Sequence, residues 1–447
     1  MLIEFRVSNF RSFNEEQVLS LVAARKDSKH PDSLIPCNGF DLLKSAVVYG
    51  ANAAGKSNLV KAIGMMRWIV CNSATRLNHG VPIPGISPFL FSKDTTEAPT
   101  TFEVTLRIDE ARFTYGFSAT QERVLGEWLS AYPRGGREQK WFQRFHNLET
   151  KSTEWKFRGP LEKENKNIRD ALQNTRDNCL LLSYAAQLNV QSLLRLYLWF
   201  SNGLWVFDLS DQPVALHYGT TVRLRDNKAF HDRVVKLIHD ADLGIDDIQI
   251  LEEPVRVNLP AAFMNHISEE GLRVLATGKT LTPIALHGIS LLDLSGNCPG
   301  RLDTPVILNM LEHESNGTNR FFALIGPCLD ALDKGTVVVV DELECSMHPL
   351  LTRKLIELFQ SPEENKKGAQ LIFATHDVSL MAPDLLRRDQ IWIVEKRESG
   401  ASVLFSLYDF ETKDRPRNTE SFQRNYLAGR YGGVPKFGPA LEDLETR

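Results

Sequence analysis

The sequence predicts an α/β protein in which a mixed β-sheet with flanking helices carries a phosphate-binding site. A strand-like stretch, Ala46–Tyr49, runs into the segment Gly50–Ser57, which fits G-x-x-x-x-G-K-[ST] and is followed by a helical pattern. The run Val337–Val340 is wholly apolar, as a buried parallel strand should be, and it ends in two acids. A third apolar stretch, Leu371–Ala374, ends before a Thr-His-Asp triplet.

The composition indicates a globular protein with a balanced charge. The chain has 447 residues, 43% hydrophobic and 24% charged, which is enough to bury one or two substantial cores. A net charge of −4 argues against an acidic or basic tail protein. Six cysteines without a C-x-x-C pair fit neither a zinc site nor a disulfide framework. Without a signal-peptide pattern or an apolar run of ~18 residues, we expect a cytoplasmic protein that contacts no membrane.

The N-terminal part, residues 1–159, is expected to combine the segment Gly50–Ser57, here called the phosphate loop, with a peripheral antiparallel β-region. Residues 101–108 and 112–119 alternate apolar and polar side chains around Asp109-Glu110, which predicts a β-hairpin. Further strand-like segments are 2–7, 17–23, 124–132, 140–145 and 155–157. After the phosphate loop, apolar residues recur at helical spacing at Leu59, Ile63, Met66 and Val70.

The rest of the chain divides into three expected parts. Residues 160–302 interrupt the phosphate-binding machinery and are expected to form an inserted, mainly helical lobe, with helices near 178–200 and 227–241. No heptads are sustained there, so a long coiled-coil arm is not expected. Residues 303–398 complete the phosphate-binding domain, and a tail at 399–447 packs on it.

The phosphate loop supplies most of the expected nucleotide contacts. Its glycines let backbone N–H groups turn inward around phosphate oxygens, and the helix that follows offers its positive end. Lys56 should reach the β and γ phosphates of ATP, and Ser57 should ligate Mg²⁺. The expected ATP-binding residues of the loop are Gly50, Asn52, Ala53, Ala54, Gly55, Lys56, Ser57 and Asn58.

Two strand ends supply the expected catalytic groups. Asp341 would hold Mg²⁺, directly or through water, and Glu342 would orient and deprotonate the attacking water. His376 would donate a hydrogen bond to the γ-phosphate and sense its presence. Strand ends often carry acids, and a histidine there is often satisfied by the backbone. Asp341, Glu342 and His376 are therefore interpreted as catalytic only because the same chain contains the phosphate loop.

A serine-glycine turn lies between these segments. Ser315 and Gly317 open an expected helix, residues 319–332, which contains Pro327 and should be kinked there. Alone, such a turn is only a helix N-cap. A helix N-terminus is also an anion site, and this one precedes the acidic strand.

The order of phosphate loop, serine-glycine turn, acidic strand and histidine resembles the ABC-type ATPases. The chain resembles their SMC/RecF/OLD group and, more narrowly, the stand-alone ATPases of bacterial abortive-infection and antiphage operons. The matching segments are 9–13, 49–58, 87–89, 314–318, 341–349 and 426–435.

This resemblance implies further roles. Lys56, Glu342 and His376 would be catalytic in ATP hydrolysis, and Arg11 would contact the nucleotide phosphates. Ser315 and Gly317 would close over ATP held by another subunit, so at least a homodimer is expected. Residues 344–349 would form the D-loop, which touches the partner subunit's site. The family usually has a glutamine that links Mg²⁺ to the helical lobe, but residues 87–89 stand in its place without one, so that role stays unassigned.

The resemblance also bears on partners. Relatives of the OLD type carry a C-terminal Toprim nuclease built on a Glu and an Asp-x-Asp, whereas only 70 residues follow Asp377 here and none spells that motif. It therefore implies a sensor or regulator of an antiviral system whose effector is encoded separately, as in the PARIS-type pair. The alternative is a RecF-like DNA-binding ATPase of repair or recombination. An autonomous nuclease would need an acid cluster that the sequence does not show.

One basic segment with aromatic residues has two interpretations, of which one is nucleic-acid binding. Residues 134–176 hold eleven Lys or Arg against six acids, interleaved with aromatic residues. Basic groups neutralise phosphates and aromatic rings stack on bases. The same pattern fits a strand pair with a buried apolar face and a solvated basic face, and both interpretations stand.

Overall fold

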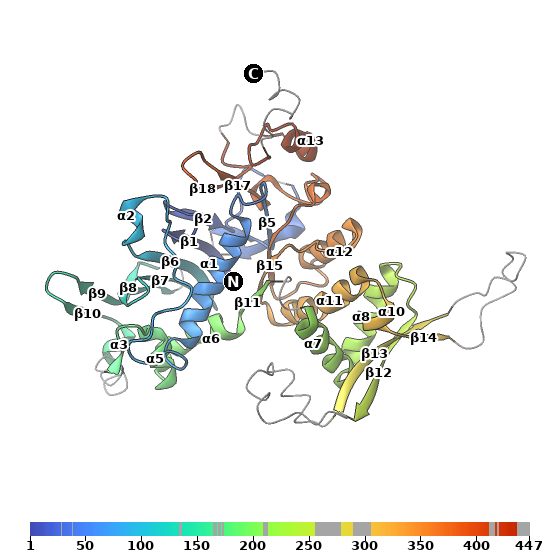
Figure 1. Cartoon of the computed structure of the whole chain (residues 1–447), viewed down its shortest axis with the longest axis horizontal. Helices are drawn as coiled ribbons and strands as arrows, with labels where there is room; N and C mark the ends of the chain where they lie inside the picture. Colours follow the sequence, from blue (N-terminus) through green and yellow to red (C-terminus); the bar gives the residue numbers. More distant parts are fainter. Residues whose placement is uncertain are drawn as a thin grey trace, which may run out of the picture. The chain divides into compact units, whose positions relative to one another are not determined.

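A computed structural model gives the fold of the chain (Figure 1). It describes residues 1–435 except 28, 38, 134–135, 164–167, 169–170, 172–173, 209–212, 255–278, 289–304, 411–415 and 418–419. The chain forms two compact units: Met1–Phe207 with Leu332–Leu343 and Glu357–Arg447, and Asp208–Ala331 with Glu344–Ile356. The described part of residues 160–207 thus belongs to the unit that holds the phosphate loop, and the described part of residues 303–398 is divided between the two units. Within the described ranges, no helix is long and apolar enough to cross a bilayer.

The first unit contains a six-stranded sheet in the order β11-β15-β16-β5-β17-β18. Its strands are Leu204–Asp208 (β11), Val337–Asp341 (β15), Gln370–Ala374 (β16), Ser45–Tyr49 (β5), Ile391–Lys396 (β17) and Ser402–Ser406 (β18). β15, β16, β5 and β17 run parallel, and β18 is antiparallel to β17. Every residue of β5, β15 and β16 is buried, which explains their continuous apolar runs.

Helix α1 (Lys56–Asn72) continues from the phosphate loop and packs against β15 and β16. The sequence predicted this helix, and the four apolar residues at helical spacing, Leu59, Ile63, Met66 and Val70, are all buried in it. The outer side of α1 is covered by α5 (Leu181–Gln187) and α6 (Gln191–Asn202). The sequence predicted one helix here, but Asn189 adopts a left-handed φ of 55° and separates two.

The second sheet of this unit has seven antiparallel strands in the order β10-β9-β8-β7-β6-β1-β2. They are Ser152–Phe157, Gln139–Asn147, Val124–Tyr132, Ala111–Ala119, Thr100–Ile108, Leu2–Ser8 and Gln17–Ser20. The predicted hairpin is β6–β7, in which Ile108 pairs with Ala111. Smaller elements are η1 (Pro31–Ser33), β3 (Leu34–Cys37), β4 (Phe40–Leu43), α2 (Lys93–Thr96), α3 (Pro160–Lys163), η4 (Val378–Leu380), η5 (Arg388–Gln390) and α13 (Phe422–Leu427).

The second unit combines helices with a three-stranded antiparallel sheet, β12-β13-β14. The strands are Asp247–Pro254, Lys279–His287 and Val306–Asn309. The helices are α7 (Pro213–Asp226), α8 (Lys228–Asp240), α10 (Met310–His313) and most of α11 (Asn316–Lys334) and α12 (Pro349–Gln360), whose last turns belong to the first unit. Pro327 lies inside α11.

Candidate nucleotide-binding site

The carboxyl ends of three parallel strands meet at one edge of the central sheet. Val340 of β15 pairs with Phe373 of β16, which pairs with Val47 of β5. Each strand ends within two residues of that level, and neighbouring strands lie about 4.8 Å apart. The acids after β15, the histidine after β16 and the phosphate loop after β5 therefore leave the sheet side by side, with the histidine strand in the middle.

The phosphate loop wraps around the side chain of Lys56. Lys56 is only 6% exposed, and its Nζ donates to the carbonyl oxygens of Gly50 (2.8 Å) and Ala51 (3.2 Å). Ala53 has a left-handed φ of 59° and Gly55 a φ of 121°. The loop therefore holds a cation at its centre and leads directly into the N-terminus of α1, where phosphate groups bind well.

Both glycines of the motif are required by their surroundings. A Cβ on Gly50 would lie 2.4 Å from the carbonyl oxygen of Val394. A Cβ on Gly55 would lie 2.6 Å from Oγ of Ser402 and 2.9 Å from Oγ of Ser12. The sequence motif identified these glycines, but it did not predict that the hydroxyls of Ser12 and Ser402 lie beside Gly55.

The acidic pair is split by a backbone turn. Asp341 is buried at 6% exposure, whereas Glu342 is exposed and has a left-handed φ of 52°. The next residue, Leu343, is buried and donates its N–H to Ala374 at 3.2 Å. A left-handed non-glycine residue costs about 1–3 kcal/mol, so the surrounding contacts hold this turn against strain. The turn presents Glu342 outward while Asp341 stays at the strand end.

The segment after β16 is anchored to its neighbour β5. Thr375 is fully buried and donates its N–H to Val48 at 3.2 Å, while Tyr49 donates its hydroxyl to the carbonyl oxygen of Asp377 at 3.2 Å. His376, between these anchored residues, is exposed. Its position is therefore set by the same strand that delivers the phosphate loop.

The loop that carries Arg11 is tied to the segment at residues 87–89. Arg11 has a φ of 52° and donates its N–H to the carbonyl oxygen of Ser87 at 2.7 Å. The Asn9 side-chain oxygen accepts from the N–H of Phe89 at 2.9 Å. Arg11 is exposed, and the adjacent Ser12 accepts from Nδ2 of Asn58 at 2.8 Å. These bonds place the Arg11 loop beside the first turn of α1.

Ser315 and Gly317 belong to the second unit, whereas the residues above belong to the first. The Ser315 hydroxyl accepts from the N–H of Thr318 at 3.1 Å, which makes it the N-cap of α11. A Cβ on Gly317 would lie 2.7 Å from the carbonyl oxygen of Ser346, in the segment expected as the D-loop. The serine-glycine turn and that segment are therefore neighbours in one unit.

Ser57 and Asp341 suit a magnesium ion. A hydroxyl and a carboxylate are the hard oxygen donors that Mg²⁺ prefers. Over the described residues, no group of three or more His, Cys, Asp or Glu is arranged to hold a metal. A magnesium site needs no such group, because the ion usually takes one or two carboxylates, substrate phosphates and water.

Residues 45–382 match the protein family described as "AAA domain, putative AbiEii toxin, Type IV TA system". The chain belongs to this family. The family's description, an AAA domain of a putative AbiEii toxin, agrees with the resemblance to abortive-infection ATPases that the sequence shows. No curated protein matches the chain.

Several solved structures are similar to the chain. The SMC head domain from Thermotoga maritima is 13% identical and covers 91% of this chain and 98% of its own, with a TM-score of 0.37. The Smc head domain bound to the C-terminal domain of ScpA, from Pyrococcus furiosus, is 13% identical over 91% and 96%, with a TM-score of 0.36. The recombination mediator protein RecF is 14% identical over 91% and 98%, with a TM-score of 0.33.

Proposed function

We propose that the chain binds and hydrolyses ATP as the sensor or regulator subunit of a prokaryotic antiviral system of the abortive-infection type. In this proposal it controls a separately encoded effector. The main support is the convergence of the phosphate loop, the acidic pair and His376 at one sheet edge. The family description is consistent with such a system, because it names a putative toxin of a type IV toxin–antitoxin system.

Each side chain at the sheet edge has a proposed task. Lys56 would exchange its bonds to loop carbonyls for phosphate oxygens, which an ammonium group binds more strongly. Ser57 and Asp341 would hold Mg²⁺, which neutralises charge on the phosphates when bound. Glu342, at the exposed turn, would accept a proton from the attacking water. His376 would donate a hydrogen bond to the γ-phosphate.

Two further contacts are proposed for the phosphates. Arg11 would reach them from its loop beside α1. Ser315 and Gly317 would reach them from a second copy of the chain, through the N-terminus of α11, where anions are stabilised. The functional assembly would then be at least a homodimer with ATP between the subunits.

The ATPase proposal is tested by steady-state hydrolysis. We expect Lys56→Ala to abolish ATP binding and turnover, and Glu342→Gln to keep binding while turnover falls by about 100-fold or more. Lys61→Ala is the matched control, because Lys61 is exposed on the same helix. Turnover that survives in both site variants would contradict the proposed roles.

The regulator proposal is tested by co-purification. The Glu342→Gln variant, loaded with ATP and Mg²⁺, is mixed with the products of the neighbouring genes. Capture of one such product that depends on ATP supports the proposal. Retention of none of them, by a variant that does bind ATP, contradicts it.

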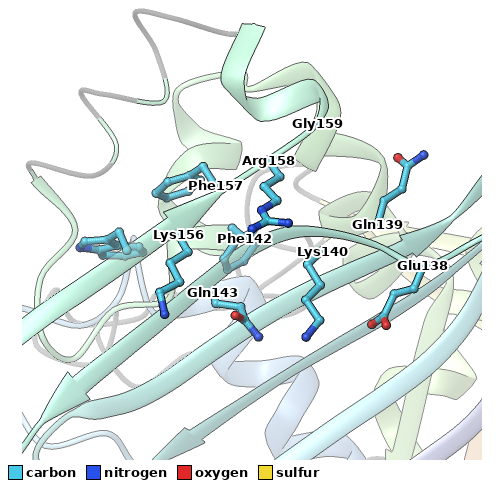
Figure 2. Close-up of a pocket in the computed structure, with 10 residues that line it drawn as sticks. Glu138, Gln139, Lys140, Phe142, Gln143, Lys156, Phe157, Arg158 and Gly159 are labelled. Atoms are coloured by element: carbon cyan, nitrogen blue, oxygen red, sulfur yellow. The ribbon is translucent and has the colours of Figure 1, made fainter.

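A second candidate function, a RecF-like DNA-binding ATPase of repair or recombination, is favoured by a hollow on the β9–β10 hairpin (Figure 2). The cavity measures about 960 Å³ and is lined by Lys140, Gln143, Lys156 and Arg158 together with aromatic residues. Figure 2 shows the first three of these side chains on one side of the hairpin. A smaller cavity of about 360 Å³ shares Gln143 and Lys156 and adds Phe145, which is 59% exposed.

Basic groups beside an exposed ring suit a nucleic-acid strand. Binding to duplex and single-stranded DNA is measured by fluorescence anisotropy over a series of salt concentrations. We expect the double variant Lys140→Glu/Lys156→Glu to weaken binding and to reduce the salt slope by about 1.8 for duplex DNA. Lys151→Glu, in the hairpin turn outside both cavities, is the control. Equal binding by wild type and double variant would remove this candidate site.

A further inference from the structure

The β17–β18 hairpin packs closely against the phosphate loop. Its strands pair antiparallel, with Val394 opposite Leu404 and Lys396 opposite Ser402. The Val394 carbonyl faces Gly50 at the start of the loop, and Ser402 faces Gly55 at its end. Both ends of the loop therefore rest on a hairpin that is far away in the sequence, and its second strand lies in the expected tail.

Ser402 donates hydrogen bonds directly to the phosphate loop and to Ser12. Its side chain is buried, with the residue 1% exposed, and its Oγ donates to the carbonyl oxygen of Ala54 at 2.5 Å. Its N–H donates to the carbonyl oxygen of Ser12 at 2.7 Å. Ser12 in turn accepts from Asn58 at 2.8 Å. A continuous set of hydrogen bonds thus runs from β18 to the loop and to the first turn of α1.

The bond to Ala54 has a consequence for the next residue. A peptide unit is planar and trans, so the carbonyl oxygen of Ala54 and the N–H of Gly55 point in opposite directions. When Ser402 holds that carbonyl on the hairpin side, the Gly55 N–H is held on the opposite side. Backbone N–H groups of such a loop are the donors that cradle phosphates.

We propose that Ser402 is a positioning residue for phosphate binding, which fixes the Ala54–Gly55 peptide so that the Gly55 N–H is preset to donate to a phosphate of ATP. This inference rests on the proposed ATP-binding function. Without the hydroxyl, this peptide could rotate, and part of the binding free energy would be needed to order it again. The loss falls on nucleotide affinity, because Ser402 lies on β18 whereas Glu342 follows β15, and three strands separate the two in the sheet.

The test compares Ser402→Ala, Ser402→Thr and Ser406→Ala in the full-length protein. Threonine keeps the hydroxyl and suits a strand. Ser406 is the matched control, because it is buried in the same strand and its hydroxyl accepts from the N–H of Tyr408. The measurements are the Kd for a fluorescent methylanthraniloyl ATP, kcat and KM for ATP, and amide hydrogen exchange of residues 50–58 without nucleotide.

We expect Ser402→Ala to raise Kd and KM about 5-fold at nearly unchanged kcat, as for the loss of one hydrogen bond. Exchange in the loop should accelerate by a similar factor, while Ser402→Thr and Ser406→Ala stay within about twofold of wild type. Unchanged affinity and exchange in Ser402→Ala would overturn the inference, as would equal losses in Ser402→Ala and Ser402→Thr. A wild-type protein that binds no nucleotide, although Ser402→Ala still loosens the loop, would instead refute ATP binding.

Discussion

Glu127 is a fully buried carboxylate whose loss should locally open the structure that supports α1. It accepts from the hydroxyl of Tyr115 (3.0 Å) and from the N–H groups of Leu181 (2.7 Å) and Leu182 (3.0 Å), the first residues of α5. A guanidinium nitrogen of Arg144 lies 3.9 Å away. Burial raises the pKa of Glu127, and Arg144 and the helix N–H groups oppose that rise.

The cost of Glu127→Gln follows from these contacts. The new amide group would face one of the donors, which leaves a buried donor unsatisfied at about 1–3 kcal/mol. It would also leave the charge of Arg144, which is 4% exposed, without its buried carboxylate, and breaking a buried pair costs about 3–5 kcal/mol. Because such terms are not additive, we expect about 4 kcal/mol in total, or about a 1000-fold change in the opening equilibrium.

Amide hydrogen exchange measures this change locally, which suits a chain of two compact units. Amides of α5 should exchange about 1000-fold faster in Glu127→Gln. Glu122→Gln, on an exposed turn of the same β-region, should leave them unchanged. An acceleration of less than about tenfold would show that the buried carboxylate does not hold the start of α5.

Two further predictions concern the candidate site, and one concerns His217, which is buried in α7. Gly317→Ala should keep nucleotide binding by the chain's own loop but lower ATP turnover more than about tenfold, because the new Cβ meets the Ser346 carbonyl; parallel losses of binding and turnover would contradict this. Burial lowers the pKa of His217 from 6.5 to about 4, so the folded state binds this proton less readily than the unfolded state. Stability should therefore fall by about 3 kcal/mol as pH drops from 6.5 to 4, and His217→Gln should lack this component in acid titrations followed by circular dichroism; equal acid sensitivity would refute it. Chelation of Mg²⁺ should stop ATP turnover by the wild type. In the same ATPase assay, Asp341→Asn with Mg²⁺ should show turnover as low as that of the chelated wild type. Near-normal turnover by the variant would exclude Asp341 as a magnesium ligand.

Features with a local cause were accessible from the sequence. The apolar runs that became β15 and β16 are continuous because both faces of those strands are buried, and the glycines of the loop mark a turn with little space for a Cβ. The split between α5 and α6 also has a local cause that the prediction passed over. Asn189 takes the left-handed conformation, which asparagine adopts more readily than most residues.

Features that depend on distant contacts were not accessible. Ser402 lies 348 residues from Ala54, and nothing in its own neighbourhood indicates a bond to the phosphate loop. The tail was expected only to pack on the domain, yet it supplies β18 to the central sheet. The contact of Ser12 with the loop could not be predicted either, since only the folded chain brings its hydroxyl beside Gly55.

The most direct test of the proposed site is the solution mass of Glu342→Gln with ATP and Mg²⁺. This variant should bind ATP but hydrolyse it slowly, which would trap subunits closed around the nucleotide. We predict a mass of at least two 50.5 kDa chains with ATP, one chain without it, and one chain when Ser315→Arg is added. A particle of one chain with ATP bound would contradict a site shared between the phosphate loop of one subunit and Ser315 and Gly317 of another.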